Sequence, residues 1–354
     1  MHPTSDSGVA KPLLAVLNGE RQGIAPRWMM RQAGRYLPEY RELRADKGGF
    51  LELVYDSEAA ADITLQPLLR FGIGADGLHA AILFSDILIV PYAMGQRLWF
   101  EAGEGPRLAP QLSETALDAL EPDWTRYDAV YDTVRRVKAR IAPETTFLGF
   151  AGSPWTIATY MIAGQGSRDH AAARTLAYAD PERFAAIIDA IIDATVPYLV
   201  GQIDAGVDAV QLFDSWAGSL SPRQFQQWVI APNRMIVERL RALRPGVPVI
   251  GFPKGAGAKL VDYAVQTGVD AVGLDETVDP HWADAALPEG LPVQGNLDPL
   301  ALVAGGRSLD EAIDTILAAF PRRPHIFNLG HGILPGTPIA HVEHMLRKLG
   351  GMTR

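Results

Sequence analysis

The sequence predicts a single (β/α)8 barrel, and three observations lead to this prediction. Short apolar runs recur along the chain, each ending in glycine, proline or a polar residue, with helix-like stretches between them. The runs are rich in Val, Ile, Leu and Phe and have no polar face, as parallel strands buried on both sides require. No low-complexity linker or shift of composition divides the 354 residues. We therefore expect one catalytic barrel domain over residues 13–354, preceded by a flexible, polar extension over residues 1–12.

Eight apolar runs are the candidate strands, and their number favours a closed barrel. An open, doubly wound sheet uses the same alternation of strands and helices and remains the alternative. Helical periodicity between the runs is clearest over 183–205 and 310–320. The runs are 27–35, 78–86, 146–155, 207–216, 247–255, 269–277, 291–299 and 325–332.

Polar residues lie at the ends of most of these runs. In a barrel, catalytic residues gather at the carboxyl ends of the strands, so these positions are the first place to seek a site. They are Arg31, Arg35, Asp86, Asp214, Ser215, Lys254, Asp275, Asn296, Asp298 and His331.

Composition narrows the classes of function. Hydrophobic residues make up 48% and charged residues 21%, the balance of a globular enzyme. A net charge of −9 argues against binding to nucleic acid. No apolar run reaches the roughly 18 residues of a membrane span, and the first residues do not form a secretory signal. We therefore expect a cytoplasmic protein without nucleic-acid or membrane partners.

The chain has no cysteine, which excludes disulfides, thiolate catalysis and Cys-ligated zinc or iron–sulfur centres. Its acidity would repel an anionic ligand at long range. An anionic substrate would therefore need a local cluster of arginines, and the chain contains one.

Three short patterns resemble known motifs but lack the necessary context. GIGADG (72–77) has dinucleotide-binding spacing, yet the expected order of strand and helix around it is reversed, so we interpret it as an ordinary loop. Lys254 could form a Schiff base, but a lysine near a strand end is more often structural. His341 and His344 could share a metal, but no third ligand is evident. We therefore expect no metal site.

The segment 30–44 holds four arginines, at positions 31, 35, 41 and 44. Arg31 and Arg35 flank Gln-Ala-Gly directly after an apolar run, where a solvated surface is less expected. Guanidinium groups bind carboxylates through paired hydrogen bonds, so this cluster suits a polyanionic ligand. Gly34 would also let the backbone approach that ligand. Arg41 is as well explained by a charged surface.

Asp86 is the one acid in the otherwise apolar run AAILFSDILIVP (80–91). A buried carboxylate without a partner is costly, so it needs either a partner or a function. A supporting or helix-capping role stays open. His331, between two glycines in GHG, is a weak signal by itself.

Taken together, the motifs resemble the uroporphyrinogen decarboxylase family. The resemblance runs in order from about residue 12 to the end of the chain. Its segments are MRQAGRYLPEYRE (30–42), AAILFSDILIVPYAMG (80–95), FAGSPWTIATYMIAG (150–164), QLFDSWAG (211–218), GFPKGAG (251–257), QGNLDP (294–299) and FNLGHGILPGTP (327–338). It implies a single-domain (β/α)8 barrel that forms a homodimer with facing active-site clefts.

The resemblance also implies roles for particular residues. Asp86 would accept hydrogen bonds from the pyrrole N–H groups, and Arg31 would clamp a carboxylate and relay a proton. The remaining residues implied to bind substrate are Ala33 (through its backbone), Arg35, Arg44, Tyr160, Ser215 and His331. FDSWAG departs from relatives with Glu-Ser-His, which puts the roles of residues 214 and 216 in doubt but not that of Ser215.

The implied reaction converts uroporphyrinogen III to coproporphyrinogen III by removing a carboxylate from each acetate arm. No cofactor is expected, because a protonated pyrrole ring can serve as the electron sink and Asp86 can stabilise the resulting cation. Two rivals are a thiol or corrinoid methyltransferase and a tetrapyrrole carrier. The first would require a zinc site with cysteine, which the chain lacks, and the second has no use for an acid at the ring centre.

Overall fold

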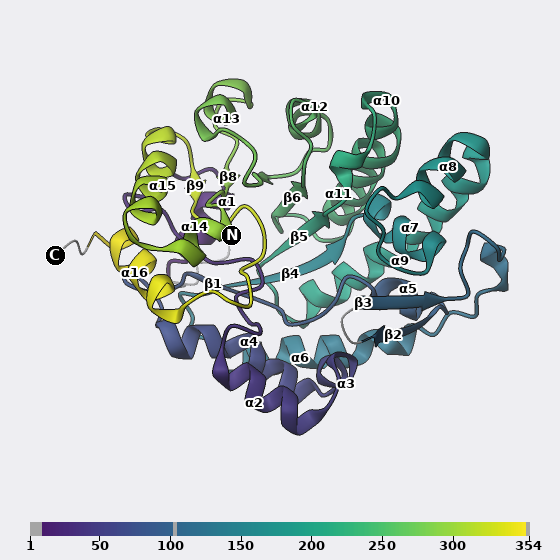
Figure 1. The fold of residues 1–354 in the computed structure, drawn as a ribbon, viewed down its shortest axis with the longest axis horizontal. Helices are drawn as coiled ribbons and strands as arrows, with labels where there is room; N and C mark the ends of the chain where they lie inside the picture. The colour runs from purple at the N-terminus through teal and green to yellow at the C-terminus, as the bar shows by residue number, and fades with distance from the viewer. Residues whose placement is uncertain (1–8, 102–104, 352–354) are drawn as a thin grey trace, which may run out of the picture.

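The structure, a computed structural model, describes residues 9–101 and 105–351. It shows one parallel sheet surrounded by helices (Figure 1). The strands follow sequence order around the sheet: β1 (Ala80–Ile82), β4 (Thr146–Gly152), β5 (Ala209–Asp214), β6 (Val249–Pro253), β7 (Ala271–Gly273), β8 (Val293–Gln294) and β9 (His325–Ile326). Each lies within a predicted apolar run and is shorter than the run that contains it.

The first predicted run closes the barrel as a bridge rather than as a full strand. Arg27 pairs in parallel with Phe327 beyond β9, and on its other side the N–H of His79 donates to the carbonyl of Arg27 at 2.8 Å. This segment therefore joins the two edges of the sheet. An open, doubly wound sheet would leave those edges apart, so the barrel prediction is confirmed.

Helices connect the strands. Many begin with proline in the first turn, where its missing N–H is no loss, and aspartates cap several of them. Asp56 accepts from Ala59 N at 3.0 Å, for example. The helices are α1 (Pro12–Leu17), α2 (Pro38–Lys47), α3 (Phe50–Tyr55), α4 (Ser57–Phe71), α5 (Ile89–Ala93), α6 (Asp128–Lys138), α7 (Pro154–Ala163), α8 (Ala171–Ala179), α9 (Pro181–Ala205), α10 (Pro222–Phe225), α11 (Ala231–Leu243), α12 (Lys259–Gln266), α13 (Pro280–Ala286), α14 (Pro299–Ala304), α15 (Gly306–Ala319) and α16 (Ile339–Leu349).

The two helices expected from periodicity are present as α9 and α15. Among the described residues, α9 is the one helix long and apolar enough to cross a membrane, but 56% of its most apolar 18-residue window is buried. It packs against α6, α7, α11 and β4. Its apolarity is therefore that of a core helix.

A two-stranded antiparallel hairpin stands apart from the barrel sheet and was not expected. It consists of β2 (Arg97–Glu101) and β3 (Gly105–Ala109), which follow α5 (Figure 1). Arg97 lies over the Trp99 ring, β2 begins and ends with charged residues, and β3 contains Arg107, so both strands are less apolar than the barrel strands. Apolar runs therefore do not reveal this hairpin.

Most of the expected extension, residues 1–8, lies outside the described residues. In its remainder, Lys11 Nζ forms an ion pair with Asp208 Oδ2 at 2.6 Å, and α1 begins at Pro12 with Leu13 and Val16 fully buried. Lys11 and α1 therefore lie against the barrel, and the boundary between extension and barrel at residue 13 stays a prediction.

Candidate active site

A cavity of about 890 Å³ opens at the carboxyl end of the barrel. The first predicted run, the loops after β1, β5 and β9, and the β2–β3 hairpin all contribute to its lining. Seven of the eight residues implied by the resemblance line it. They are Arg31, Ala33, Arg35, Arg44, Asp86, Ser215 and His331.

Arg31 follows the bridging segment and has a backbone φ of +60°, in the left-handed region. A side chain other than glycine pays about 1–2 kcal/mol for that conformation, and such strain often occurs at functional sites. Gly332 makes room for it, because a Cβ there would lie 2.4 Å from Arg31 Cδ. The backbone thus presents the Arg31 guanidinium, which is exposed, to the cavity.

Three arginines of the cavity, at positions 31, 35 and 44, have no carboxylate partner within the described part of the chain. Arg41, in contrast, donates to the carbonyls of Arg35 at 2.9 Å and of Tyr36 at 3.2 Å, so it holds the loop. Cations that no described carboxylate neutralises, gathered around one hollow, form an anion-binding surface.

The backbone of the RQAGR loop adds to this surface. Among the hydrogen bonds of the described residues, none is donated by the N–H of Ala33, Gly34 or Arg35. Ala33 and Gly34 line the cavity. Consecutive N–H groups without an internal acceptor can bind a carboxylate of a ligand.

Asp86 lies on the wall of the same cavity, after β1. Its Oδ1 accepts from Leu88 N at 2.7 Å in the turn before α5, and the cap position of that helix, Leu88, has no side-chain cap hydrogen bond, so Asp86 supports the turn rather than capping the helix. Among the described residues, the bond from Leu88 N is the only hydrogen bond that the Asp86 carboxylate makes, and the carboxylate has no ion pair. Burial raises the pKa of Asp86, although the Leu88 N–H and the nearby Arg31 charge oppose the shift. The Asp86 carboxylate therefore stabilises a turn and also faces a cavity whose arginines have no carboxylate partner among the described residues.

His331 lies between two glycines that make room for its neighbours. A Cβ on Gly330 would lie 2.2 Å from the backbone nitrogen of Glu276, and one on Gly332 would meet Arg31. Burial, together with the charges of Arg31 and Lys254, lowers the pKa of His331 to about 4. Its imidazole is therefore neutral near pH 7 and can donate one hydrogen bond.

Ser215 directly follows β5, and Tyr160 lies on α7. Ser215 lines the cavity directly. Tyr160 is not among the lining residues, but its ring centroid is 6.4 Å from that of Trp216, next to Ser215. Burial and the Asp86 charge raise the pKa of Tyr160, which places its hydroxyl within electrostatic reach of Asp86. It therefore stands at the edge of the site.

Several polar residues at strand ends do not line the cavity. Asp275 accepts from Gly255 N at 2.7 Å and from Thr277 N at 2.9 Å, and Asp298 accepts from Leu300 N at 2.8 Å as the cap of α14. Strand-end location alone did not distinguish these roles.

Three further residues are likewise engaged away from the cavity. Asn296 donates to the carbonyls of Asp275 and Val278. Lys254 forms an ion pair with Glu276 at 3.1 Å. Asp214 is fully buried behind β5. These contacts favour the structural interpretation of Lys254.

The remaining motifs are structural as well. GIGADG forms the turn between α4 and β1, as expected of an ordinary loop. His341 Nδ1 contacts the carbonyl of Leu302, and His344 Nε2 contacts Asp310. The described residues contain no group of three His, Asp or Glu side chains placed to hold a metal.

The sequence reasoning missed an aromatic wall of the cavity. Phe50, Phe84 and Phe100 pack edge to face, with ring centroids 5.5 Å and 4.9 Å apart, and Tyr40 packs on Phe84 at 5.9 Å. All four line the cavity. They come from four separate elements, so no local pattern could have indicated them. The wall offers an apolar, aromatic surface in the same cavity as the charged groups.

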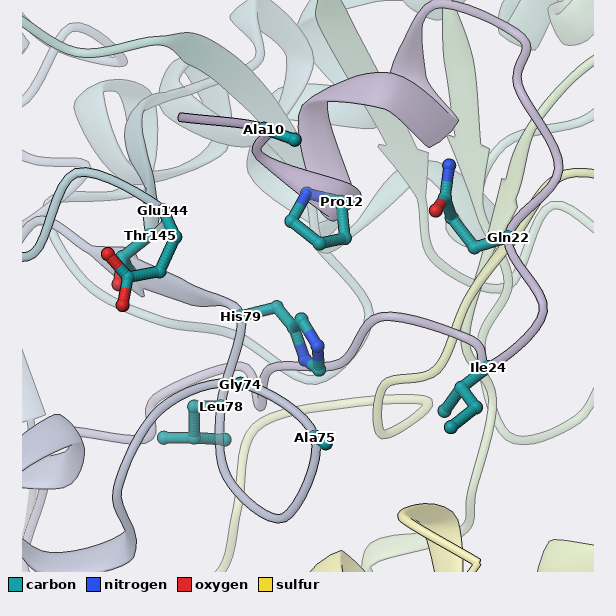
Figure 2. Close-up of a pocket in the computed structure, with 10 residues that line it drawn as sticks. All are labelled: Ala10, Pro12, Gln22, Ile24, Gly74, Ala75, Leu78, His79, Glu144 and Thr145. Atoms are coloured by element: carbon teal, nitrogen blue, oxygen red, sulfur yellow. The ribbon is translucent and has the colours of Figure 1, made fainter. Parts of the chain in front are cut away.

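A second, smaller cavity of about 390 Å³ lies at the other end of the barrel (Figure 2). Its lining comes from the residues before and after α1, the α4–β1 loop and the start of β4, with the His79 ring in the middle of the view. Burial and the Arg27 charge lower the pKa of His79 to about 4. None of the expected site residues lies here, so the larger cavity is the candidate active site.

Comparison with known proteins gives a consistent family. A family model described as "Uroporphyrinogen decarboxylase (URO-D)" matches residues 9–349. A protein named uroporphyrinogen decarboxylase from Sphingopyxis alaskensis is 72% identical over 96% of this chain and 98% of its own length. One of the same name from Rhizorhabdus wittichii is 70% identical over the same shares.

Solved structures share the fold at low sequence identity. A methyltransferase from Methanosarcina mazei superposes with a TM-score of 0.78 at 17% identity, over 97% of this chain and 98% of that one. A B12-independent methionine synthase from Shewanella has a TM-score of 0.55 at 10% identity, over 93% and 94%. These likenesses concern the barrel alone.

Proposed function

Because the chain belongs to the uroporphyrinogen decarboxylase family, we propose that it decarboxylates the four acetate arms of uroporphyrinogen III in turn and releases coproporphyrinogen III. The observation that carries the proposal is the pairing of opposite features in one cavity. Within the described structure, Asp86 has no ion-pair partner, and three arginines that share its cavity have no carboxylate partner. A macrocycle with N–H donors at its centre and carboxylates at its rim matches both.

Each residue then has a role that follows from its chemistry. Asp86 accepts hydrogen bonds from the pyrrole N–H groups, because an ionised carboxylate is an acceptor only. The arginines bind carboxylates of the substrate through charge-assisted hydrogen bonds. Backbone N–H groups at Ala33 and the neutral donors of His331, Ser215 and Tyr160 complete the shell. The aromatic wall contacts the apolar edge of the rings.

The reaction proceeds by protonation, loss of carbon dioxide and a second protonation. A proton first adds to a pyrrole carbon and creates an iminium-like cation, which the Asp86 carboxylate stabilises. The bond to the carboxylate carbon then breaks, its electron pair neutralises the ring, and an exocyclic methylene remains. A proton adds to that methylene to form methyl, and the proton on the ring leaves. Net consumption is one proton for each carbon dioxide released.

Arg31 clamps a carboxylate of the reacting arm and relays the proton that adds to the pyrrole ring. It is close enough to Asp86 for its charge to lower the pKa of that carboxyl. A guanidinium is a weak acid, with a pKa above about 12, so the relay depends on a stronger donor delivering the proton. The substrate itself supplies the electron sink, and no cofactor is required.

The enzyme works as a cytoplasmic homodimer with facing clefts and without nucleic-acid or membrane partners. The family supports the assembly, and the net charge of −9 supports the lack of nucleic-acid binding. Light scattering of the purified protein at micromolar concentration tests the dimer. A monomer that remains fully active would contradict it.

The test of function is conversion of uroporphyrinogen by the purified protein after exhaustive chelation and dialysis. We expect intermediates that have lost successive carboxylates, followed by coproporphyrinogen, when products are oxidised and separated by chromatography. Binding without conversion would indicate a carrier. Activity that returns only with an added metal, flavin or pyridoxal phosphate would refute the cofactor-free mechanism.

A further inference from the structure

Asp214 is a buried acid that the proposed reaction does not use. It is the last residue of β5, between Phe213 and Ser215, both of which line the cavity. Side chains alternate along a strand, so the Asp214 side chain points away from the cavity and is fully buried. Burial raises its pKa to about 7, although the neighbouring Thr156 and Asn233 side chains oppose the shift, and the Oδ2 atom forms no hydrogen bond within the described part of the chain. A carboxylate kept under these conditions needs an explanation.

Its other oxygen has a short contact with α7. Thr156 Oγ1 donates to Asp214 Oδ1 at 2.6 Å, and both side chains are fully buried. Thr156 Oγ1 in turn accepts from the backbone N–H of Trp216 at 3.2 Å. The direction of the relay is fixed, because a backbone N–H can only donate and a hydroxyl has only one proton. Asp214 therefore orients the hydroxyl that receives the Trp216 N–H.

The carbonyl of Trp216 is held as well. It accepts from Trp155 Nε1 at 3.1 Å and from Ser219 Oγ at 2.7 Å. Asp214 is fixed in the sheet, where its carbonyl accepts from Lys254 N at 3.0 Å. Ser215 thus lies between two residues whose backbones are tied to the barrel and to α7. The Ser215 backbone therefore has little freedom to move away from the cavity.

The same network reaches Tyr160. Thr156 and Tyr160 are one helical turn apart on α7, so they lie on the same side of that helix. The Trp216 ring packs against Tyr160 and, on another side, against His170 with centroids 4.8 Å apart. Ser215 and Tyr160 belong to different elements, and this network joins them.

We propose that Asp214 and Thr156 are positioning residues that hold Ser215 and Tyr160 together at the rim of the cavity. The inference rests on the proposed function, in which both of these residues contact substrate carboxylates. Neither Asp214 nor Thr156 touches the substrate. Their effect passes through the Trp216 backbone and ring.

The test compares two buried threonines of α7. Thr156→Val removes the relay at nearly constant volume, and Thr156→Ser restores a hydroxyl. Thr159→Val is the matched control, because Thr159 is 3% exposed and donates only to the Thr156 carbonyl, within the helix. We expect Thr156→Val to lower kcat/KM about tenfold, mainly through KM, as the loss of one hydrogen bond implies. Thr156→Ser and Thr159→Val should remain near wild type.

A double variant separates positioning from general damage. If Thr156 acts through Ser215, then Thr156→Val combined with Ser215→Ala should lose little more than Ser215→Ala alone. Losses that multiply fully would overturn the proposal, as would wild-type kinetics of Thr156→Val or an equal loss in Thr159→Val. Should Thr156→Val not fold, Thr156→Ala removes the same hydroxyl and is measured in its place.

Hydrogen exchange gives a readout that needs no activity. The Trp216 amide should exchange faster in Thr156→Val than in wild type or in Thr159→Val. Unchanged exchange would refute the positioning role even in an active enzyme. If wild type does not decarboxylate uroporphyrinogen at all, the proposed function fails, while the exchange result still decides whether Thr156 holds this loop.

Discussion

Arg27 and Arg31 lie four residues apart on the segment that closes the barrel, and they reach opposite ends of it. Arg27 is 1% exposed, and its guanidinium donates to the carbonyls of Gly77, at 3.0 Å, and Ala75. Arg31 is exposed to the large cavity and has no ion pair among the described residues. An arginine thus stabilises the fold at the amino end of the barrel, whereas another arginine at the carboxyl end remains available to a ligand.

The carboxylates show the same contrast. Asp208, at the amino end of β5, is within 2.6 Å of Lys11 Nζ and 3.1 Å of Lys138 Nζ, and it accepts from Phe147 N at 2.7 Å. Asp86, at the carboxyl end, accepts one hydrogen bond, from the Leu88 N–H, and faces the cavity. Barrels place stability at the amino end and chemistry at the carboxyl end. Here the difference is visible in which charges already have partners.

The sharpest way to break the comparison is to remove two charges from the carboxyl end. Arg31→Ala with Arg35→Ala should each remove a charge-assisted contact worth about 1.5–3 kcal/mol. If the losses add, kcat/KM falls roughly a hundredfold to ten-thousandfold, with little change in melting temperature. Steady-state kinetics of the single and double variants decide this. Kinetics close to wild type would mean that the anion clamp lies elsewhere.

The amino end should respond in the opposite way. Arg27→Met keeps the volume but leaves the carbonyls of Gly77 and Ala75 without a donor. We expect the free energy of unfolding to fall by about 1–3 kcal/mol, while kcat/KM per folded molecule stays near wild type. Denaturant titration and kinetics on the same sample test this. A folded Arg27→Met enzyme with impaired catalysis would contradict a purely structural role for the amino end of the barrel.

Asp214 sharpens the comparison, because it lies at the carboxyl end of the barrel but is buried and hydrogen-bonded to Thr156 instead of facing the cavity. Its pKa rises from 3.8 to about 7 on burial, so the folded state binds the proton more tightly than the unfolded state. Wild-type stability contributed by this group is then greatest below about pH 4 and is lost as the pH rises to about 7. The Asp214→Asn variant should not lose this stability as the pH rises, because asparagine does not titrate.

Melting temperatures measured over a pH series test the expectation. The advantage of Asp214→Asn over wild type should grow between about pH 4 and pH 7 and then stay constant. Parallel curves for the two proteins would show that Asp214 does not titrate in this range.

The smallest effect concerns His331, whose pKa near 4 keeps it neutral in the working range. Glutamine is also neutral and can donate, so His331→Gln should change the size of kcat/KM modestly and leave its pH dependence between about pH 6 and pH 8 unchanged. A profile that flattens in the variant would show that His331 is the titrating group.

Much of the architecture could be predicted from sequence because buried parallel strands are apolar on both faces. The eight runs therefore indicated the closed barrel, although the first run proved to be a bridge at Arg27. The β2–β3 hairpin could not be found in this way, because it lies outside the barrel sheet. Its Phe100 packs on Phe50, a contact between distant segments that no local pattern encodes.

The site was predictable where a charge stood in an unusual setting. Asp86 in an apolar run and Arg31 after one both line the cavity. Asp214 and Asp275, chosen because they follow strands, instead hold loops. Strand alternation relative to Phe213 and Ser215 could have shown that Asp214 points away. Hydrogen-bond partners of Asp275 depend on the folded loops and could not have been foreseen.

The most direct test of the account is Asp86→Asn, measured for both rate and stability. Asparagine can still accept the Leu88 N–H, but its amide presents donors to the donors of the pyrrole ring and carries no charge to offset the cation. We expect kcat/KM to fall about a hundredfold or more. The melting temperature should hold or rise, because burial of the ionised carboxylate is costly. A destabilised enzyme with full activity per folded molecule would contradict the central role of Asp86.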